Sequence, residues 1–203
     1  DARGPARRGL LASGRRPAGG FGLLVKEFSK HKKQNLVMRD LQQLIQDRLN
    51  QMLITNPQRI DYLQRYQQII AEYNGEQDRA TIEKTFMELM DLANSMDEEQ
   101  QRYVREGFSS DEELSVYDLL FSDNLSRKDI QAIKKVAVDV LAKVKSKIAE
   151  LDHWTDKQET RATVDNLIRD TLWEELPECY DELSISGYRQ KIYEYVYTRY
   201  KEA

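Results

Sequence analysis

The sequence predicts an all-α fold, a helical bundle of about seven or eight helices. Apolar residues recur at spacings of three and four along most of the chain, which is the period of one buried helix face. No segment shows the sustained period-two alternation of a half-buried strand. Only three of the nine glycines follow residue 22, so few positions favour a sharp change of direction. We interpret residues 23–107 and 108–203 as two helical halves, with two sub-bundles as one possible arrangement.

The first helix is predicted over Leu36–Leu53, where the apolar positions form a single stripe. This stripe consists of Val37, Leu41, Leu44, Ile45, Leu49, Met52 and Leu53. Asn56 is a good N-cap, and Pro57 suits the first position of a helix because its missing N–H has no partner there. These two residues therefore predict a second helix, which we expect to end at Asn74-Gly75.

The next two helices are marked by their ends. Thr81–Met96 presents apolar residues on one side and predicts the third helix. The acidic stretch 97–100 is predicted to cap a short fourth helix, which Gly107 closes, because glycine accepts the left-handed conformation that often ends a helix.

Three Ser or Thr residues are followed three positions later by an acidic or amide residue, the spacing of a capping box. The pairs are Ser110 with Glu113, Ser126 with Asp129, and Thr155 with Gln158. They predict helices near residues 111–121, 127–151 and 156–175. A loop around Pro177 and Tyr180-Asp181 follows, and the last helix is predicted over Gly187–Tyr200.

The first 22 residues differ in composition from the rest of the chain. They contain six glycines, two prolines and five arginines against one acidic residue. Such a segment cannot bury enough apolar surface to offset its ordering entropy, so we predict that residues 1–22 are a disordered tail of cloning origin. A basic arm that grips phosphates is the alternative. No apolar run is long enough for a secretory signal.

The rest of the chain, residues 23–203, carries a net negative charge. Removing the tail's net charge of +4 from the chain's −4 leaves −8 on residues 23–203. Because non-specific DNA affinity grows with the number of phosphates that Lys and Arg neutralise, this charge argues against a DNA-wrapping module. The single cysteine, Cys179, excludes an internal disulfide framework. No apolar run reaches membrane-spanning length, and we expect a cytoplasmic protein without membrane contact.

No catalytic, cofactor or metal site is predicted in this chain. Neither GxxxxGK[ST] nor GxGxxG occurs, so no motif indicates nucleotide binding. The two histidines, His31 and His153, are far apart in sequence and lie in no Cys/His cluster. Cys179 has no sequence-adjacent histidine or helix start to activate it, and we expect it to be a small packed side chain.

One predicted helix carries a basic face opposite an apolar face. The basic residues are Arg127, Lys128, Lys134, Lys135, Lys143, Lys145 and Lys147. The apolar residues are Ile130, Ile133, Ala137, Val140, Val144 and Ile148. This pattern is typical of a surface helix docked on a core, with a solvated basic face. Contact with DNA phosphates is the alternative, through Arg127, Lys128, Lys134, Lys135 and Lys145 in particular.

The last helix carries an aromatic stripe made of Tyr188, Ile192, Tyr195, Val196 and Tyr200. We expect this stripe to pack against a neighbouring helix rather than to stack on bases.

Two blocks of residues carry a resemblance to a known family. The first contains NPQRIDYL (56–63), IIAEYN (69–74), EQQRYVREG (99–107) and SDEELSVYDLL (110–120). The second contains DHW (152–154), RA (161–162), IRD (168–170), LP (176–177), YD (180–181), Lys191 and residues 193–200. Together they cover about residues 25–203. They resemble the helical C-terminal region of the R subunit of type I restriction-modification enzymes.

The resemblance implies a function that belongs to a larger enzyme. In that family the whole subunit is an ATP-dependent DNA translocase and endonuclease, with a metal-dependent nuclease domain and two RecA-like motor domains. The family's nuclease and ATP-binding residues have no counterparts in this chain, so ATP and Mg²⁺ are implied only for those other domains. The helical region is implied to pack against the motor domains of its own subunit and to contact the modification and specificity subunits.

We therefore predict a non-catalytic assembly domain that seats the R subunit on the methyltransferase core. Its partner surface is expected in the last two helices and in the loop at 177–183. The candidate contact residues are Tyr180, Asp181, Arg189, Lys191 and Arg199. DNA is the secondary candidate partner, through the basic face described above.

Overall fold

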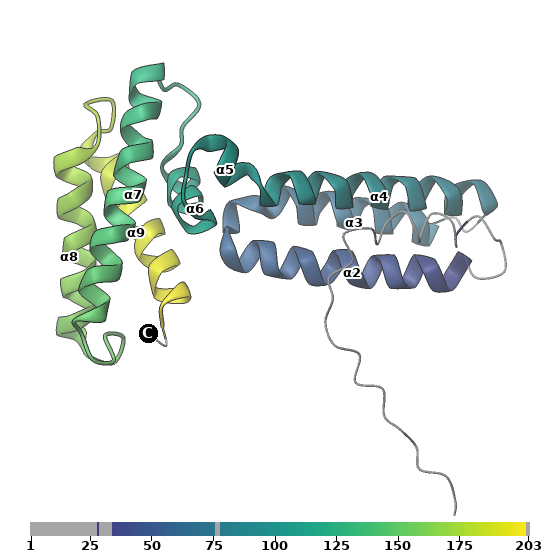
Figure 1. Ribbon diagram of the computed structural model, residues 1–203, viewed down its shortest axis with the longest axis horizontal. Coiled ribbons are helices and arrows are strands. Elements are labelled where there is room, and N and C mark those ends of the chain that lie inside the picture. Colours follow the sequence, from purple (N-terminus) through teal and green to yellow (C-terminus); the bar gives the residue numbers. More distant parts are fainter. Residues whose placement is uncertain (1–27, 29–33, 76–77, 202–203) are drawn as a thin grey trace, which may run out of the picture. The chain divides into compact units, whose positions relative to one another are not determined.

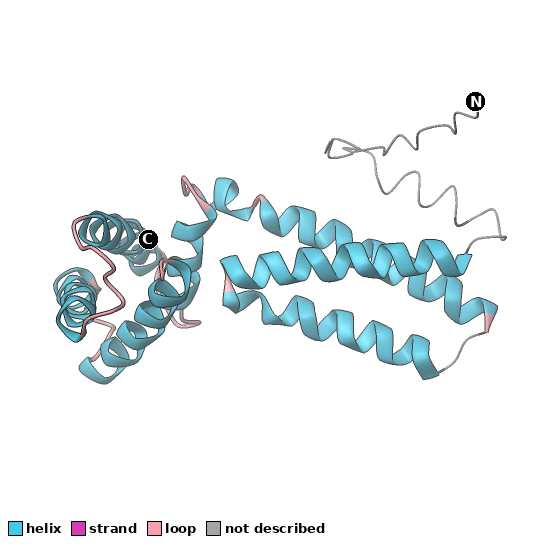
Figure 2. Cartoon of the chain, turned by 90° about the horizontal axis from the view of Figure 1, so that it is seen from below, coloured by secondary structure: helices cyan, strands magenta, loops and turns pink. Residues whose placement is uncertain are grey.

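The computed structural model describes residues 28, 34–75 and 78–201. These residues form eight α-helices and one 3₁₀-helix, with no strand among them (Figure 2). The predicted all-α fold is therefore confirmed for the described part of the chain. The predicted tail, residues 1–22, lies outside it. The chain separates into two units, residues 1–41 and 42–203, and the predicted halves at 23–107 and 108–203 stay a prediction.

The first unit contributes the beginning of α2, which runs from Gln34 to Thr55. Phe28, Val37, Met38 and Leu41 of this unit are buried. The second unit holds the rest of α2, where the predicted stripe continues. Its buried members there are Ile45, Leu49 and Met52, whereas Leu44 is exposed and Leu53 is half-buried.

Asn56 begins the next element as predicted. Its side-chain oxygen accepts a hydrogen bond from the backbone N–H of Gln58 at 3.1 Å. The first turn is a 3₁₀-helix, η1 (Pro57–Arg59), and it leads into α3 (Ile60–Gly75). The end of α3 at Gly75 agrees with the prediction.

α4 (Arg79–Gln100) lies alongside α3 and is longer than predicted at both ends (Figure 1). It begins earlier because the Asp78 carboxylate accepts a hydrogen bond from the Thr81 N–H at 2.7 Å. The predicted cap at residues 97–100 is wrong, because these residues form the last turn of α4. The short α5 (Arg102–Glu106) follows and ends at Gly107, as predicted. Gly107 has a φ of +85°, a conformation that glycine adopts without a side-chain clash.

Two serine caps predicted from sequence are present. Ser110 precedes α6 (Asp111–Leu120), and its hydroxyl oxygen accepts a hydrogen bond from the Glu113 N–H at 3.3 Å. Ser126 precedes α7 (Arg127–Ala149). Both halves of its capping box are formed, with Asp129 in the place of the usual Glu.

The last two helices differ from the prediction at their starts. α8 (Gln158–Glu175) is preceded by Lys157, which makes no side-chain cap, so the predicted Thr155 cap is wrong. The Thr155 hydroxyl donates to the Lys201 carbonyl at 3.4 Å instead. α9 (Glu182–Arg199) begins before the predicted Gly187, because the Asp181 carboxylate accepts a hydrogen bond from the Ser184 N–H at 2.8 Å.

Helices α6 to α9 enclose one apolar core. The predicted stripe of α7 is buried there apart from the half-buried Ile130, and Ile192, Tyr195 and Val196 of α9 complete it. The predicted packing of the α9 stripe is thus confirmed. Trp154 lies fully buried in this core, and its indole N–H donates to the Tyr200 carbonyl at 2.7 Å. None of the described helices has the length and apolar character that crossing a membrane requires.

Candidate functional site

The end of the α8–α9 pair carries two exposed apolar side chains. Trp173 is 59% exposed and lies two residues before the end of α8. Leu183 is 84% exposed and is the second residue of α9. The loop 176–181 joins these two helix ends, so both side chains lie at the same end of the helix pair. We call residues 173–183 the α8–α9 corner.

Tyr180 fixes this corner to the bundle. The residue is buried, and its hydroxyl donates to the Leu120 carbonyl at the end of α6 at 2.7 Å. Its ring meets the Tyr188 ring edge-on at a centroid distance of 5.3 Å. Burial raises the pKa of the Tyr180 phenol well above its ordinary value, so the hydroxyl stays a proton donor at neutral pH. Most of Tyr180 therefore faces the core rather than solvent.

Cys179 corrects one expectation, because it is exposed rather than packed. It lies in a tight turn in which the Tyr180 N–H donates to the Pro177 carbonyl at 3.0 Å. With Tyr180 directed into the core, the preceding side chain is left outside it.

The other four predicted contact residues are spread along α9. Asp181 caps the helix, and its hydrogen bonds with Ser184 lower the pKa of the carboxyl group. Arg189 forms an ion pair with Asp165 of α8 at 3.3 Å. Lys191 is exposed, with its ammonium 5.5 Å from the centre of the Tyr188 ring.

Arg199, near the end of α9, donates through Nε to Glu112 of α6 at 3.2 Å. Lys191 and Arg199 line a groove between α9 and the end of α2, whereas Tyr180 and Asp181 belong to the α8–α9 corner. Four of the five candidates therefore divide between two places on the second unit, and Arg189 lies in neither of them.

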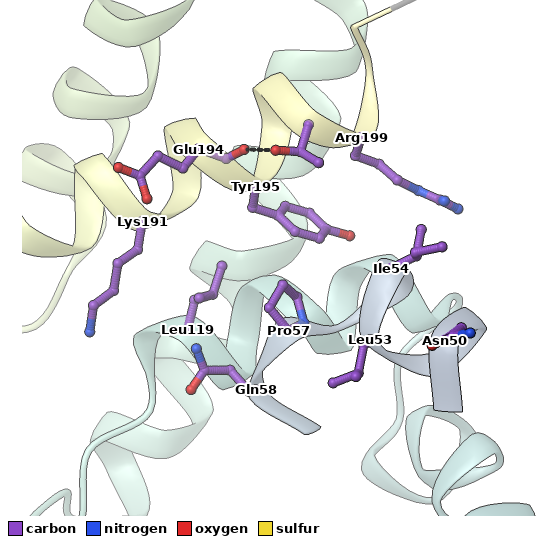
Figure 3. A pocket seen from close by; sticks show the side chains of 11 residues that line it. Asn50, Leu53, Ile54, Pro57, Gln58, Leu119, Lys191, Glu194, Tyr195 and Arg199 are labelled. Atoms are coloured by element: carbon purple, nitrogen blue, oxygen red, sulfur yellow. Dashed lines mark hydrogen bonds between the residues drawn. The ribbon is translucent and has the colours of Figure 1, made fainter. Parts of the chain in front are cut away.

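The groove has a volume of about 920 Å³ and lies between α9 and the end of α2 (Figure 3). Its apolar lining includes Leu53 and Ile54 in the last turn of α2, together with Pro57 and Leu119. Tyr195 of α9 faces these residues, and Figure 3 shows its phenol pointing from α9 toward Ile54. This groove is not predictable from the sequence, because two of its walls come from segments more than 130 residues apart.

The basic face of α7 is largely neutralised by neighbouring carboxylates. Lys134 pairs with Glu106 at 2.8 Å and lies over the rings of Phe108 and Tyr117. Other ion pairs on this helix join Lys143 to Glu175, Lys145 to Glu112, and Lys147 to Glu150. In these ion pairs the lysine charge is neutralised, whereas a phosphate-binding surface would leave it free.

Three cations of α7 remain without an ion pair in the described part of the chain. They are Arg127, Lys128 and Lys135, and all three are exposed. Of the five predicted DNA-contact residues, these three keep their charge available, while Lys134 and Lys145 do not.

A buried ionic cluster that no sequence pattern predicts joins η1, α4 and α6. Arg59 is 3% exposed and forms a two-pronged ion pair with Asp111, with nitrogen–oxygen distances of 2.8 and 2.6 Å. Its Nε donates to Glu99 at 3.0 Å. Burial alone would lower the pKa of the Arg59 guanidinium, but its hydrogen bonds to Asp111 and Glu99 raise it above the ordinary value.

A second set of polar contacts extends this cluster. Arg102 pairs with both Glu99 and Asp118, and the buried Asn56 amide donates to Asp118 at 2.7 Å. Burial raises the pKa of the Asp118 carboxyl, against the opposing effect of Arg102. We call Arg59, Glu99, Arg102, Asp111 and Asp118 the junction cluster. Its pairing of cations with anions indicates a structural role.

Among the described residues, no group of three or more His, Cys, Asp or Glu side chains is arranged to hold a metal ion. His153 is exposed at the surface beside Asp152, and His31 lies outside the described residues.

Comparison with known families decides the identity of the domain. Residues 23–185 match the family described as "Type I restriction enzyme HindI endonuclease subunit-like, C-terminal". The chain belongs to this family. The resemblance predicted from sequence is confirmed, and this type I restriction enzyme C-terminal domain comes from an endonuclease subunit-like protein. No curated protein and no solved structure matches the chain. The match covers all described helices through the first residues of α9, and thus includes the α8–α9 corner.

Proposed function

We propose that this domain is a non-catalytic assembly module that seats the type I restriction R subunit on a core of modification and specificity subunits. Membership of the family supports an association with other restriction-modification subunits. The observation that carries our choice of surface is the exposure of Trp173 and Leu183 at one end of the α8–α9 pair.

Large apolar side chains at a rigid position suit a protein interface. Tryptophan is enriched among the residues whose truncation costs most in protein–protein binding, and such residues are usually surrounded by a polar rim. Asp181, the N-cap of α9, and Arg189, within the same helix as Leu183, supply charged groups. Because the Tyr180 hydroxyl ties the corner to α6, a partner would meet a preformed surface and lose little entropy in ordering it.

In this proposal the chemistry of the enzyme lies elsewhere in the subunit. The nuclease and motor domains of the family use Mg²⁺ and ATP to cleave and translocate DNA. The helical domain packs against the motor and holds it to the cytoplasmic methyltransferase core, so its task is to transmit force through a rigid contact.

The proposal is tested by mixing the 203-residue chain with the cognate core of modification and specificity subunits and following complex formation by size-exclusion chromatography. We expect co-migration without DNA at moderate salt. Trp173→Asp should weaken the complex by about 30-fold, or roughly 2 kcal/mol, as expected for an interface anchor.

Met87→Asp is the matched control. Met87 is 57% exposed, close to the 59% of Trp173, but it lies in the middle of α4. It should bind the core as the wild type does. Equal loss in both variants, or full binding by a folded Trp173→Asp, would remove the α8–α9 corner from the proposal. Absence of any complex with the wild-type chain would remove the seating role itself.

A second candidate function is a DNA contact through α7, and the three unpaired cations Arg127, Lys128 and Lys135 favour it. Binding to phosphates releases counterions and therefore weakens steeply as the salt concentration rises. Salt-sensitive binding of the chain to DNA alone, lost on Lys128→Glu with Lys135→Glu, would support this function. An interface with an apolar centre should respond much less to salt.

A further inference from the structure

The two exposed apolar side chains of the α8–α9 corner lie among acidic residues. Residues 173–183 contain five acidic residues and no Lys, Arg or His. Glu174 directly follows Trp173, and Glu182 directly precedes Leu183. Both glutamates are exposed, so each apolar side chain has a charged neighbour in contact with water. The surface of the corner is therefore apolar at two points and negative beside them.

Most of this negative charge has no cation to neutralise it. Of the five acidic residues, Glu175 forms an ion pair, with Lys143 of α7. The other four have no cationic partner within the part of the chain that the structure describes. Arg169, one turn before Trp173 on α8, pairs with Asp170 at 2.8 Å. The corner thus presents unpaired negative charge to whatever covers it.

This charge distinguishes between the occupants that an exposed apolar surface could have. A second copy of the chain would bring the same carboxylates against each other, and like charges that face across an interface are strongly unfavourable. DNA and anionic membranes are repelled for the same reason. Arg127 and Lys128 at the start of α7 are also exposed and unpaired, but they are fewer than the four unpaired carboxylates. A basic protein surface is the occupant that the apolar side chains and the charge both favour.

We propose that the α8–α9 corner binds a basic surface of another protein, on which Lys and Arg side chains surround an apolar recess that takes the Trp173 indole. The inference rests on the proposed seating role, in which the corner is the contact surface, and it adds the chemistry of the partner. A guanidinium at the edge of the recess can stack on the indole and pair with the neighbouring Glu174. Glu178 and Glu182 attract further cations of the partner, which speeds the encounter and fixes its orientation.

The first test uses a phage-displayed library of random 12-residue peptides, selected on the full 203-residue chain. Clones that also bind Trp173→Asp are removed. Because this variant is more acidic than the wild type, the step discards peptides that bind through charge alone. We expect the surviving sequences to combine Lys or Arg with aromatic or aliphatic residues. Enriched sequences that are acidic or uncharged, or no enrichment at all, would overturn the proposal.

A synthetic peptide of the most enriched sequence is then measured by fluorescence anisotropy. The triple variant Glu174→Gln, Glu178→Gln, Glu182→Gln should bind it about tenfold more weakly at about 0.05 M salt. At about 0.5 M salt the difference should be much smaller, because the charges are then screened. Unchanged binding by the triple variant at low salt would show that the carboxylates do not select the partner.

The matched control removes the same number of charges at the opposite end of α8. Asp152, Asp156 and Glu159 are exposed and lie at or before the start of that helix. Asp152→Asn, Asp156→Asn, Glu159→Gln should bind the peptide within about twofold of the wild type. Circular dichroism should show equal helix content in all variants, since every replaced side chain is exposed. An equal loss of binding in both triple variants would overturn the assignment to the corner.

Binding to the cognate core of modification and specificity subunits separates this inference from the seating role. The Glu174, Glu178 and Glu182 triple variant should associate with the core about tenfold more slowly at low salt and dissociate at a rate within about threefold of the wild type, because peripheral charges act mainly on the encounter. If it associates as fast as the wild type while Trp173→Asp fails to bind, the basic partner surface is overturned and the seating role stands. A chain that binds basic peptides at the corner but no core would overturn the seating role and support the chemistry proposed here.

Discussion

The junction cluster and the α6–α9 core connect distant parts of the chain by opposite physical means. In the junction, Arg59 brings together carboxylates from α4 and α6 that lie 40 and 52 positions away in sequence. In the core, Trp154 and the apolar faces of four helices pack together, and the ion pairs that join these helices, such as Arg189 with Asp165, lie outside the buried apolar cluster. Ion pairs are directional, whereas apolar packing depends on area and shape. The junction therefore fixes an angle between elements, whereas the core stabilises the fold through the apolar area that it buries.

In the seating role that we propose, a domain that holds a motor to a DNA-bound core must resist bending where its elements meet. A two-pronged arginine–carboxylate pair resists rotation because both of its hydrogen bonds must keep their geometry. Burying such charges contributes little net stability, but breaking the set leaves an uncompensated buried charge. We expect the junction to be stiff rather than strongly stabilising.

The largest effect is expected from truncation in the apolar core. Trp154→Ala removes a fully buried indole, its hydrogen bond to the Tyr200 carbonyl, and its edge-on contacts with Tyr193 and Tyr197. Substitutions of this kind cost about 3–5 kcal/mol. Urea denaturation followed by circular dichroism should show this loss. Trp173→Ala is the control, because the exposed indole should change the free energy of unfolding by less than about 0.5 kcal/mol. A similar small change for Trp154→Ala would contradict the central place of the residue in the core.

A smaller loss is expected from the junction. Arg59→Met keeps most of the side-chain volume but leaves Glu99 and Asp111 without their shared cation. The cost should be about 2–3 kcal/mol, below the usual range for a buried pair because the Asp111 side chain is 25% exposed. Hydrogen–deuterium exchange should show the gain in exchange confined to η1 and the facing ends of α4 and α6.

The exposed pair of Arg79 with Glu83 gives the control for that experiment. Arg79→Met should change the free energy of unfolding by less than about 0.5 kcal/mol, as is usual for a surface ion pair. If Arg59→Met were equally neutral, the junction cluster would not hold these elements together, and the contrast with the apolar core would fail.

The same contrast explains which features the sequence could predict. The caps at Asn56, Ser110 and Ser126 were predictable because each depends on residues two or three positions apart. The basic and apolar faces of α7 followed from helical period alone. The start of α9 differs from the prediction because Asp181, which the sequence places in a loop, is the N-cap of the helix.

Long-range features could not be predicted in this way. Nothing local marks Arg59 as a buried cation, since its partners lie in other helices. The groove needs residues from both ends of the second unit, and the ion pairs of α7 depend on carboxylates brought in by neighbouring helices. The sequence indicated that Lys191 and Arg199 were candidates for contact, but only the fold places them on one groove.

The smallest expected effect concerns pH. It sharpens the comparison because the pKa values of carboxyl groups in the two regions shift in opposite directions. Burial alone would raise the pKa of Glu112 in the bundle, but its contacts with Lys145, Tyr200 and Arg199 lower it below the ordinary value of 4.5. Its stabilising contribution is therefore present above about pH 4.5 and is lost as the pH falls through the lowered pKa. Glu112→Gln should cost about 1 kcal/mol at pH 7 and weaken the loss of stability in acid, measured by urea denaturation across this pH range.

Asp118 in the junction should show the opposite sign. Because burial raises its pKa, its contribution is present at low pH and is lost as the pH rises through the raised value. Asp118→Asn keeps an acceptor for Asn56 and Arg102 and removes the buried charge, so it should cost less at pH 7 than Glu112→Gln does. The reverse order, with Asp118→Asn the more damaging change, would mean that the charge of Asp118 is needed to hold Arg102. The junction would then resemble the bundle in how it uses its carboxylates.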